Sequence, residues 1–400
     1  MHNAPIRTLT LGLAEAHPIP LEVIAHAGTI LQRASTRYTE AGYEVQTVRL
    51  STRPIFDDLA DWSPAALLTY VQELQGVLDN VGLTFCSLGP AQVARPNFPL
   101  ERLNLIADLL ASTSAFNATV QLASPIYGLR TEAALPTARI MHRLAQETEE
   151  GFGNFRFAML ACLEPGYPFF PAAYHSGPTS LSLGLQGAGI LTHALQRFLI
   201  ARNNKAVAET LPVDLLQVSE IVKAALVDYA SPLIVIAQEL AAEENMLFGG
   251  IDLSPAPMGE DSIVMAMELC GYGFVGTPGT LAVASALTSA LKSTALPTCG
   301  YCGLMLPVLE DAVLGQRWQE GLVNAHQLLL YSAVCGTGLD TLPLPGDIAV
   351  EEIARLLLDV ATLALRLHKP LSARIFPVPG KRAGDYTTFT SPYLTNTRVR

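Results

Sequence analysis

Residues 7–50 read RTLTLGLAEAHPIPLEVIAHAGTILQRASTRYTEAGYEVQTVRL, a strand, a helix and a second strand in close succession. Arg7–Leu13 and Glu44–Leu50 are short runs rich in aliphatic and β-branched residues, which predict strands. Between them, Leu21–Glu40 carries apolar residues at helical spacing and is followed by Gly42, which predicts a helix and its end. Repeated units of this kind build parallel sheets and α/β barrels.

The alternation of strands and helices continues along the chain. Further strands are predicted at Leu83–Leu88, Asn117–Ala123, Phe155–Cys162, Ser180–Leu185, Leu247–Leu253, Tyr301–Leu306, Leu339–Leu344 and Leu371–Phe376. The predicted helices are Pro64–Leu78, Glu101–Ser112, Glu132–Glu147, Ala188–Ile200, Leu215–Asp228, Ser231–Asn245, Ile263–Cys270, Thr280–Ala290, Gly321–Cys335 and Val350–Leu367. Apolar strands of the type that is buried on both faces predict one closed or nearly closed sheet wrapped by helices. We therefore expect a single large α/β domain over residues 1–400, with a helical insertion around 187–246 and a polar C-terminal tail at 385–400.

Composition and charge restrict the class of protein. Half of the 400 residues are apolar and only 15% are charged, which excludes disorder for most of the chain. The net charge of −11, without a basic stripe, argues against a nucleic-acid partner. The chain shows neither an apolar run long enough to span a membrane nor an N-terminal signal peptide, and its six cysteines are too few for a disulfide scaffold. We expect a cytoplasmic homo-oligomer with reduced thiols and no membrane association.

Carboxylates that follow strands are the first candidates for a functional site. The loops after the carboxyl ends of strands converge in α/β sheets and barrels. Asp252 ends the segment GGIDLS, Asp261 lies in the loop beyond it, Asp340 lies in CGTGLD, and Asp347 follows in PLPGD. If Asp252, Asp261 and Asp347 converge, they would hold a divalent cation, magnesium or calcium, or include a general acid and base. For Asp347 alone, the favoured interpretation is a cap of the following helix.

A glycine-rich turn and a nearby lysine are candidates for binding an anion. The turn Gly276-Thr277-Pro278-Gly279-Thr280 joins a strand-like segment to the start of a helix, where backbone N–H groups suit an anion. A tight turn in which Thr280 caps the helix is an equally good interpretation. Lys381 stands beside Gly380 near the last predicted strand. The candidate ligand-binding residues are therefore Gly276, Thr277, Gly279, Thr280, Asp347 and Gly380.

His175 lies in the long loop EPGYPFFPAAYHSGP, residues 164–178. A loop of this length is more often functional than an idle connection. Its histidine is either a proton shuttle or ligand, or a residue at the edge of the core that is hydrogen-bonded to the backbone. We take His175, Lys381, Asp252 and Asp261 as the candidate catalytic residues, with His175 and Lys381 on the rim of the site.

Cys299 and Cys302 form an isolated C-x-x-C pair. A structural zinc site needs four ligands, and the other thiols that could help, Cys270 and Cys335, are each about thirty residues away. A thioredoxin-type pair is expected between an early strand and its helix. Ordinary buried thiols are therefore favoured over a metal or redox role. The chain also carries no HExxH and no G-x-S-x-G motif, which excludes a zincin and an α/β-hydrolase triad.

Several segments in fixed order resemble the DUF711 family, which is related to the UPF0210 proteins and often labelled PFL-like. They are residues 154–185 (NFRFAMLACLEPGYPFFPAAYHSGPTSLSLGL), 249–257 (GGIDLSPAP), 274–280 (FVGTPGT), 335–347 (CGTGLDTLPLPGD) and 376–381 (FPVPGK). The resemblance runs from Arg7 to about Asp385. It implies a ten-stranded α/β barrel like that of pyruvate formate-lyase, in an oligomer.

The resemblance does not extend to radical chemistry. Glycyl-radical enzymes carry a glycine in an Arg-Val-x-Gly-Tyr-like loop near the C-terminus, and no glycine near the end of this chain has that context. We therefore expect no glycyl radical. Two functions remain open. One is an enzyme that acts on a small anionic metabolite in the barrel centre, and the other is a non-catalytic metabolite-binding, regulatory or oligomeric assembly protein.

Overall fold

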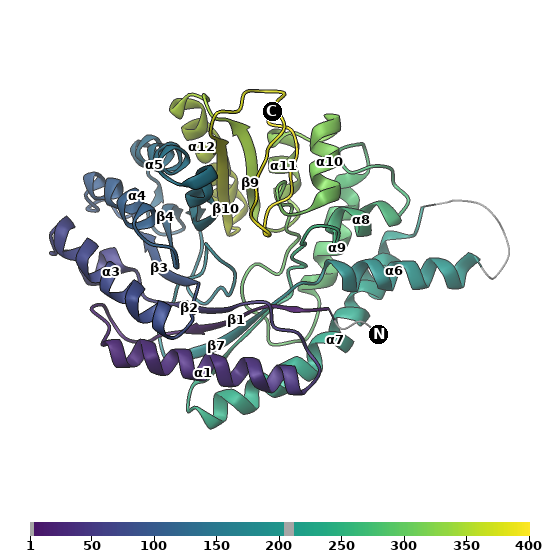
Figure 1. Ribbon diagram of the computed structural model, residues 1–400. Coiled ribbons are helices and arrows are strands. Elements are labelled where there is room, and N and C mark those ends of the chain that lie inside the picture. The colour runs from purple at the N-terminus through teal and green to yellow at the C-terminus, as the bar shows by residue number, and fades with distance from the viewer. Residues whose placement is uncertain (1–3, 204–211) are drawn as a thin grey trace.

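A computed structural model describes residues 4–203 and 212–400 of the chain. In this part of the chain ten strands form one sheet, in the order β8-β7-β1-β2-β3-β4-β6-β10-β9, with β5 paired to β4 (Figure 1). The strands are β1 Ile6–Gly12, β2 Val48–Ser51, β3 Cys86–Ala91, β4 Phe116–Ser124, β5 Gly128–Leu129, β6 Phe157–Ala161, β7 Ser180–Leu185, β8 Leu247–Asp252, β9 Gly338–Pro345 and β10 Leu371–Val378. The prediction that the apolar strand segments share one sheet wrapped by helices is confirmed.

The sheet is mixed rather than parallel. Strands β1, β2, β3, β4 and β6 run in one direction, whereas β7 pairs antiparallel with β1 and β10 pairs antiparallel with β6. The outer strands β8 and β9 run in the same direction as β7 and β10, because β8 is parallel to β7 and β9 is parallel to β10. Both edges of the sheet therefore run opposite to its centre. The strand–helix alternation did not reveal this reversal, which follows the helix-free connection between β6 and β7.

The sheet does not close into a barrel. Its edge strands β8 and β9 do not pair, and residues 297–308 lie between them as an irregular segment. The backbone of this segment forms one isolated bridge to β8, Ile251–Thr298, and one to β9, Pro307–Asp340. The strand predicted at Tyr301–Leu306 is absent, because the N–H groups of Tyr301 and Cys302 donate to a side chain, Asp252, rather than to a strand. The closed ten-stranded barrel implied by the resemblance is not confirmed.

Helices cover the outer face of the sheet (Figure 1). They are α1 Leu21–Glu40, α2 Ile55–Asp58, α3 Pro64–Asn80, α4 Asn104–Ala111, α5 Ala134–Glu147, α6 Ala188–Asn203, α7 Leu215–Glu243, α8 Ile263–Leu269, α9 Thr280–Lys292, α10 Ala312–Glu320, α11 Ala325–Ser332 and α12 Val350–Leu367. Short 3-10 helices are η1 Leu100–Leu103, η2 Thr131–Ala133 and η3 Glu149–Arg156. Among the described residues, no helix combines the length and the apolar character that a membrane crossing requires.

The predicted helices differ from the observed ones mainly at α7. Two helices were expected there, with a break at Ser231 and Pro232, but α7 is continuous and contains Pro232. Its buried face continues across the proline, from Leu226 and Ala230 to Leu233, and this packing compensates for the missing N–H. The helix α10 was not predicted. Part of the predicted insertion, residues 204–211, lies outside the described residues.

The two faces of the central strands differ in polarity. On β1, Leu9 and Leu11 belong to the main hydrophobic core, while Thr8 and Thr10 are buried on the other face. Strand β4 repeats this alternation, with apolar Ala118, Val120 and Leu122 between polar Asn117, Thr119 and Gln121. Because successive strand residues point to opposite faces, the sheet has an apolar outer face under the helices and a polar inner face. Strands β1 and β4 are buried on both faces, as expected, but their inner faces carry polar rather than apolar side chains.

The long loop between β6 and β7 packs against this polar inner face. Side chains of the central strands bind its backbone: Thr10 Oγ1 donates to Pro168 O at 2.8 Å, Gln121 Nε2 donates to Leu163 O at 2.8 Å, and Ser87 Oγ donates to Ala173 O. The loop starts after the carboxyl end of β6 and ends before β7, whose first residue pairs with the last residue of β1. It therefore enters at the carboxyl ends of the central strands and fills that side of the inner face.

Candidate functional site

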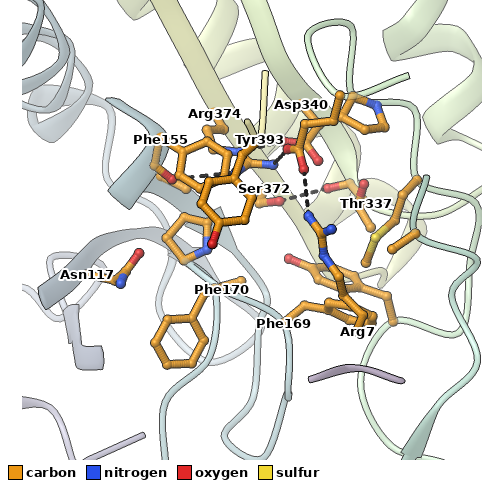
Figure 2. Close-up of a pocket in the computed structure, with 18 of the residues that line it drawn as sticks. Arg7, Asn117, Phe155, Phe169, Phe170, Thr337, Asp340, Ser372, Arg374 and Tyr393 are labelled. Atoms are coloured by element: carbon orange, nitrogen blue, oxygen red, sulfur yellow. Dashed lines mark hydrogen bonds and ion pairs between the residues drawn. The ribbon is translucent and has the colours of Figure 1, made fainter. Parts of the chain in front are cut away.

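The inner face of the sheet borders a small cavity of about 60 Å³. Five charged side chains line it, Arg7, Arg49, Arg374, Glu310 and Asp340. Aromatic side chains form much of the remaining wall (Figure 2), namely Phe85, Phe155, Phe169, Phe170, Tyr301 and Tyr393. One water molecule needs roughly 10–15 Å³ of such space. The cavity therefore has room for a small ligand of a few non-hydrogen atoms.

The cavity lies at the amino ends of the central strands. Arg7, Arg49 and Asn117 are each the second residue of their strand, β1, β2 and β4, and Phe85 directly precedes β3. The tip of the β6–β7 loop, residues 169–172, lines the cavity from the side of the carboxyl ends. The expectation of a site at the carboxyl ends does not hold for this cavity, because the loop fills that side of the sheet.

A bulge in β1 directs Arg7 into the cavity. The register of β1 against β7 shifts between Ile6 and Thr8, so that Arg7 has no partner in the ladder. A bulge re-aims the side chain of its extra residue. Without it, strict alternation would place Arg7 on the outer face with Leu9.

Two of the three cavity arginines are neutralised by carboxylates. Arg374 Nε donates to Asp340 Oδ1 at 2.6 Å, and its Nη2 donates to Glu310 Oε1 (Figure 2). Arg7 Nη2 donates to the other oxygen, Glu310 Oε2, at 3.2 Å. Burial raises the pKa of Glu310, and the two arginines oppose this effect. Burial alone would lower the pKa of Arg374, but Asp340 and Glu310 together raise it.

Arg49 is the third cavity arginine, and no carboxylate of the described residues lies within ion-pair distance of it. Its side chain is buried, and among described residues its hydrogen bonding is limited to Nε donating to Thr47 Oγ1 at 3.0 Å. Its guanidinium carbon lies 5.0 Å from the ring centroid of Phe85 and 5.3 Å from that of Phe170. Burial, with a smaller contribution from Arg7, lowers its pKa to about 9. The group is therefore still charged at neutral pH.

Arg156 is a buried arginine with a structural role, and its contacts can be compared with those of Arg49. It is also buried and has no carboxylate partner within residues 4–203 and 212–400, and burial lowers its pKa to about 10. Its terminal nitrogens donate to three backbone carbonyls, those of Thr113, Phe116 and Leu110, at 2.9, 3.0 and 2.6 Å. The terminal nitrogens of Arg49 have no such acceptors among the described residues. The charged group of Arg49 faces the cavity, whereas the charged group of Arg156 is hydrogen-bonded to backbone carbonyls inside the fold.

Sequence comparison places the chain in a family. The family described as "Uncharacterised ACR (DUF711)" matches residues 1–391. The chain belongs to the DUF711 family. It is 30% identical over 364 residues to a UPF0210 protein of Pyrobaculum arsenaticum, which covers 87% of this chain and 77% of the relative. A UPF0210 protein of Thermoanaerobacter is 28% identical over 412 residues, covering 96% of this chain and 88% of the relative.

Asp252, the first carboxylate expected in the site of this DUF711 protein, does not line the cavity. It is fully buried at the end of β8 and accepts four hydrogen bonds. The donors are the N–H and Oγ of Ser254, at 2.9 and 2.6 Å, and the N–H groups of Tyr301 and Cys302, at 2.8 and 3.0 Å. Burial raises its pKa, and these hydrogen bonds oppose that effect. Asp252 therefore fastens the irregular segment 297–308 to β8.

The other two carboxylates of the expected metal site lie in different surroundings. Asp261 is half-buried and accepts a hydrogen bond from Gln186 Nε2 at 2.9 Å, and burial raises its pKa. Asp347 is exposed in the turn after β9. It does not cap α12 either, because the N-cap is Ala349 and no side chain caps that helix. In the described ranges 4–203 and 212–400, no three His, Cys, Asp or Glu residues form a group that could hold a metal ion.

Gly380 and Lys381 lie next to the turn that carries Asp347. The backbone N–H of Gly346 donates to Lys381 O at 2.9 Å, so the structure brings these three candidates to the same turn region. Lys381 is half-exposed and Asp347 is exposed. None of the three lines the cavity.

The glycine-rich turn of residues 276–280 uses its polar groups internally. The N–H of Gly276 donates to Thr280 Oγ1 at 3.0 Å, and Thr280 Oγ1 donates to Thr277 O at 2.8 Å. Gly279, with a φ of 107°, is the N-cap of α9, so the predicted cap by Thr280 was wrong. The turn does not line the cavity. These contacts favour the interpretation of a tight turn.

His175 is held in the β6–β7 loop. Its backbone N–H donates to Thr52 O at 2.9 Å, and its ring Nε2 lies 2.9 Å from Pro178 O. Its ring packs so closely on Gly12 that a Cβ there would lie 2.1 Å from Nδ1. Burial lowers the pKa of His175, so a neutral ring is favoured. The contacts match the alternative of a core-edge histidine that is bonded to the backbone.

Cys299 and Cys302 lie in the irregular segment between β8 and β9, and both are free thiols. Burial raises the pKa of Cys302 to about 12 and that of Cys299 well above its usual value, with Asp252 adding to both effects. Because the thiolate is the reactive form of cysteine, neither side chain is activated in this structure.

The residues of the cavity were mostly missed by the sequence analysis. Asp340 was among the candidates, but Arg7, Arg49, Arg374 and Glu310 were not. A signal for the arginines was present, since each lies inside a short strand that is otherwise apolar or small, in RTLTLG, VRLS and LSARIFPV. Arginine is almost never fully buried unless it is paired. No comparable sequence signal marks Glu310.

Proposed function

We propose that this DUF711 protein binds a small organic anion in the cavity on the inner face of the sheet, and that Arg49 forms an ion pair with the anion. The observation that carries the proposal is the buried guanidinium of Arg49, which faces the cavity and has no carboxylate or carbonyl acceptor among the described residues. An enzyme acting on a small anionic metabolite and a metabolite-binding regulatory protein both require this step.

The energetics of burial support a ligand at Arg49. Removing an ion from water costs several kcal/mol, even after the protein relaxes. A desolvated cation–π contact contributes about 2 kcal/mol, and contacts with Phe85 and Phe170 together offset only part of that cost. An anion that hydrogen-bonds to the terminal nitrogens would supply the missing interaction.

The enclosure of the cavity also favours a binding site. The sheet, the β6–β7 loop and residues 297–308 surround the cavity, and Tyr393 from the C-terminal segment forms part of its wall. Tyr393 stacks on Phe155, with centroids 5.8 Å apart, and contacts the edge of Phe85. We propose that residues 297–308 complete a barrel-like wall, which excludes water and strengthens charge interactions inside.

The test is a titration of the full-length protein with acetate and inorganic phosphate, followed by calorimetry and thermal unfolding. We expect at least one of them to bind saturably to the wild type and to raise its Tm. Arg49→Met, which keeps an unbranched side chain as far as the ε position and removes the charged guanidinium, should abolish both effects.

Two arginine variants serve as controls. Arg156→Met removes an equally buried arginine outside the cavity, and Arg95→Met removes an exposed arginine that pairs with Asp57. Both should retain binding. Equal binding by wild type and Arg49→Met, or no binding of either anion to the wild type, would overturn the proposal.

A further inference from the structure

We infer that the ligand is a small monocarboxylate, with one negative charge on a planar group and no second charge. This inference rests on the proposed anion binding at Arg49. It specifies the class of the ligand from the charges, donors and walls of the same cavity.

The charges of the lining residues match one negative charge. Three arginines and two carboxylates line the cavity, which leaves a net charge of +1 (3 − 2). Arg374 is bound by both Glu310 and Asp340, and Arg7 is bound by Glu310. The positive charge that remains is that of Arg49. A ligand with a single negative charge therefore makes the cavity neutral.

The donors that remain on Arg49 suit a planar group. Its Nε is used by Thr47, so Nη1 and Nη2 are left as a planar fork of N–H groups. The rings of Phe85 and Phe170 pack on the guanidinium. A carboxylate accepts two parallel hydrogen bonds from such a fork.

Glu310 and Asp340 would select against a second negative charge. Both carboxylates line the same small cavity as Arg49, and Glu310 is close enough to affect the pKa of Arg49. A dicarboxylate or a phosphate dianion would bring a further charge toward them in a space that is largely shielded from water. Like charges in such surroundings cost several kcal/mol. The two carboxylates therefore both neutralise their arginines and restrict the charge of the ligand.

The rest of the wall fits a short, mostly apolar body. Phe155, Phe169, Ala158 and Met305 line the cavity beside the charged residues. Two polar groups are available to a ligand, since the buried hydroxyls of Thr337 and Tyr301 have no hydrogen-bond partner among the described residues. The size of the cavity, about 60 Å³, limits the ligand to a few carbon atoms.

The test measures the binding of three small probes to the full-length protein. Propionate carries one carboxylate, malonate carries a second in place of the methyl group, and propionamide carries no charge. We expect calorimetry at pH 7 to show that propionate binds at least about tenfold more tightly than malonate, and that propionamide does not bind. Arg49→Met should lose propionate binding, while Arg156→Met should keep it.

A second pair of variants tests the selectivity directly. Glu310→Gln and Asp340→Asn each remove one negative charge from the cavity wall, and in a correctly folded variant the ratio of malonate to propionate affinity should rise by roughly tenfold. Two variants are used because Glu310 joins two arginines and its replacement is more disruptive. Their circular dichroism spectra should match that of the wild type.

The outcomes separate this inference from the proposed function. Malonate or inorganic phosphate binding as tightly as propionate, with loss in Arg49→Met, would overturn the monocarboxylate and leave the anion site intact. Unchanged selectivity in both folded charge variants would likewise overturn the role of Glu310 and Asp340. If neither propionate, malonate nor phosphate binds in an Arg49-dependent way, the proposed function fails as well.

Discussion

The guanidinium carbon of Arg49 lies 5.0 Å from the centroid of the Phe85 ring, in a cavity where none of the described carboxylates forms an ion pair with it. When a cation is fully removed from water, contact with an aromatic ring replaces only part of the hydration energy that the cation loses. Arg49 is therefore held in a position that is unfavourable for the ligand-free fold. Such positions are common where a protein gives up stability for function.

The first prediction concerns the stability of Arg49→Met without ligand. Because the variant removes a buried charge that no carboxylate in the described part of the chain neutralises, we expect the free energy of unfolding to rise by about 1–3 kcal/mol. The measurement is denaturation by urea in a buffer free of carboxylates and phosphate. Arg156→Met should show the opposite sign, since it leaves three backbone carbonyls without a donor. A clear loss of stability in Arg49→Met would instead indicate a structural role.

Arg374→Met should strongly destabilise the protein. It leaves Asp340 without the arginine that donates a hydrogen bond to it, and Glu310 with Arg7 alone. Breaking a buried ion pair on one side costs about 3–5 kcal/mol. The double variant Arg374→Met with Asp340→Asn should recover part of this loss of stability, because it removes one of the carboxylate charges that Arg374→Met leaves without a partner. A double variant no more stable than Arg374→Met would contradict this account of the network.

Much of the fold could be predicted from local sequence, because it depends on local patterns. The bounds of α1 and α12 and those of β7 agree with the prediction, since helical spacing and strand runs are properties of neighbouring residues. The directions of β7 and β10 depend on pairing between distant segments, which the alternation of elements does not determine. The open form of the sheet could not be predicted for the same reason, since the contacts of Asp252 with residues 301 and 302 span some fifty positions.

The site was harder to predict than the fold. The rule that loops converge at the carboxyl ends of strands points to Asp252 and Asp347, which lie outside the cavity. The cavity is at the amino ends because the β6–β7 loop fills the other side, and no local pattern shows where a loop will fold back. The bulge that directs Arg7 inward is equally invisible in the run RTLTLGL. The arginines inside short strands were the signal that could have been used.

The association of the chain is a prediction that comes from composition. With half of its residues apolar, we expect a homo-oligomer whose interface exceeds the roughly 1,200–2,000 Å² of standard complexes. Light scattering at low micromolar concentration should give at least twice the chain mass of 42.8 kDa. A mass of one chain across the concentration range would contradict the expectation.

The stability of the protein should fall as the pH is lowered from about 6.5 to 4 because of His17. Burial lowers the pKa of His17 from 6.5 to about 4, against the smaller opposing effect of Asp58. Between these values the unfolded chain takes up a proton that the folded chain excludes, so the folded state loses stability as the pH falls. The difference of the two pKa values corresponds to about 3 kcal/mol.

The measurement for His17 is a set of denaturation curves between pH 7 and pH 4. The ring nitrogens of His17 lie 2.9 Å from Tyr70 Oη and 2.9 Å from Thr52 Oγ1, and His17→Gln retains polar groups for these contacts. The variant should be less stable than the wild type at pH 7 but should lose less stability on acidification. His326→Gln, at an exposed position, serves as the control and should follow the wild-type curve. Parallel curves for His17→Gln and wild type would refute the assignment.

Asp252→Asn distinguishes between two roles for Asp252. One is the site carboxylate expected from the sequence, and the other is the structural role that its contacts indicate. As a site carboxylate, Asp252 would be required for ligand or metal binding and its replacement would cost little stability. The structure instead gives its carboxylate four hydrogen-bond donors, and an asparagine can present only one oxygen. If its oxygen faces Ser254, the new amide donor points at the N–H of Tyr301. We expect a loss of about 1–3 kcal/mol, because a buried donor is left without an acceptor.

The same variant should retain anion binding, since Asp252 is not part of the cavity wall. The measurement pairs urea denaturation of Asp252→Asn with a propionate titration under conditions where it is fully folded. Asp261→Asn is the matched control, because Asp261 accepts a single side-chain hydrogen bond, from Gln186, and should lose less stability. If Asp252→Asn were as stable as wild type but unable to bind, Asp252 would belong to the functional site after all. A destabilised variant that binds normally would establish Asp252 as the residue that holds segment 297–308 against β8.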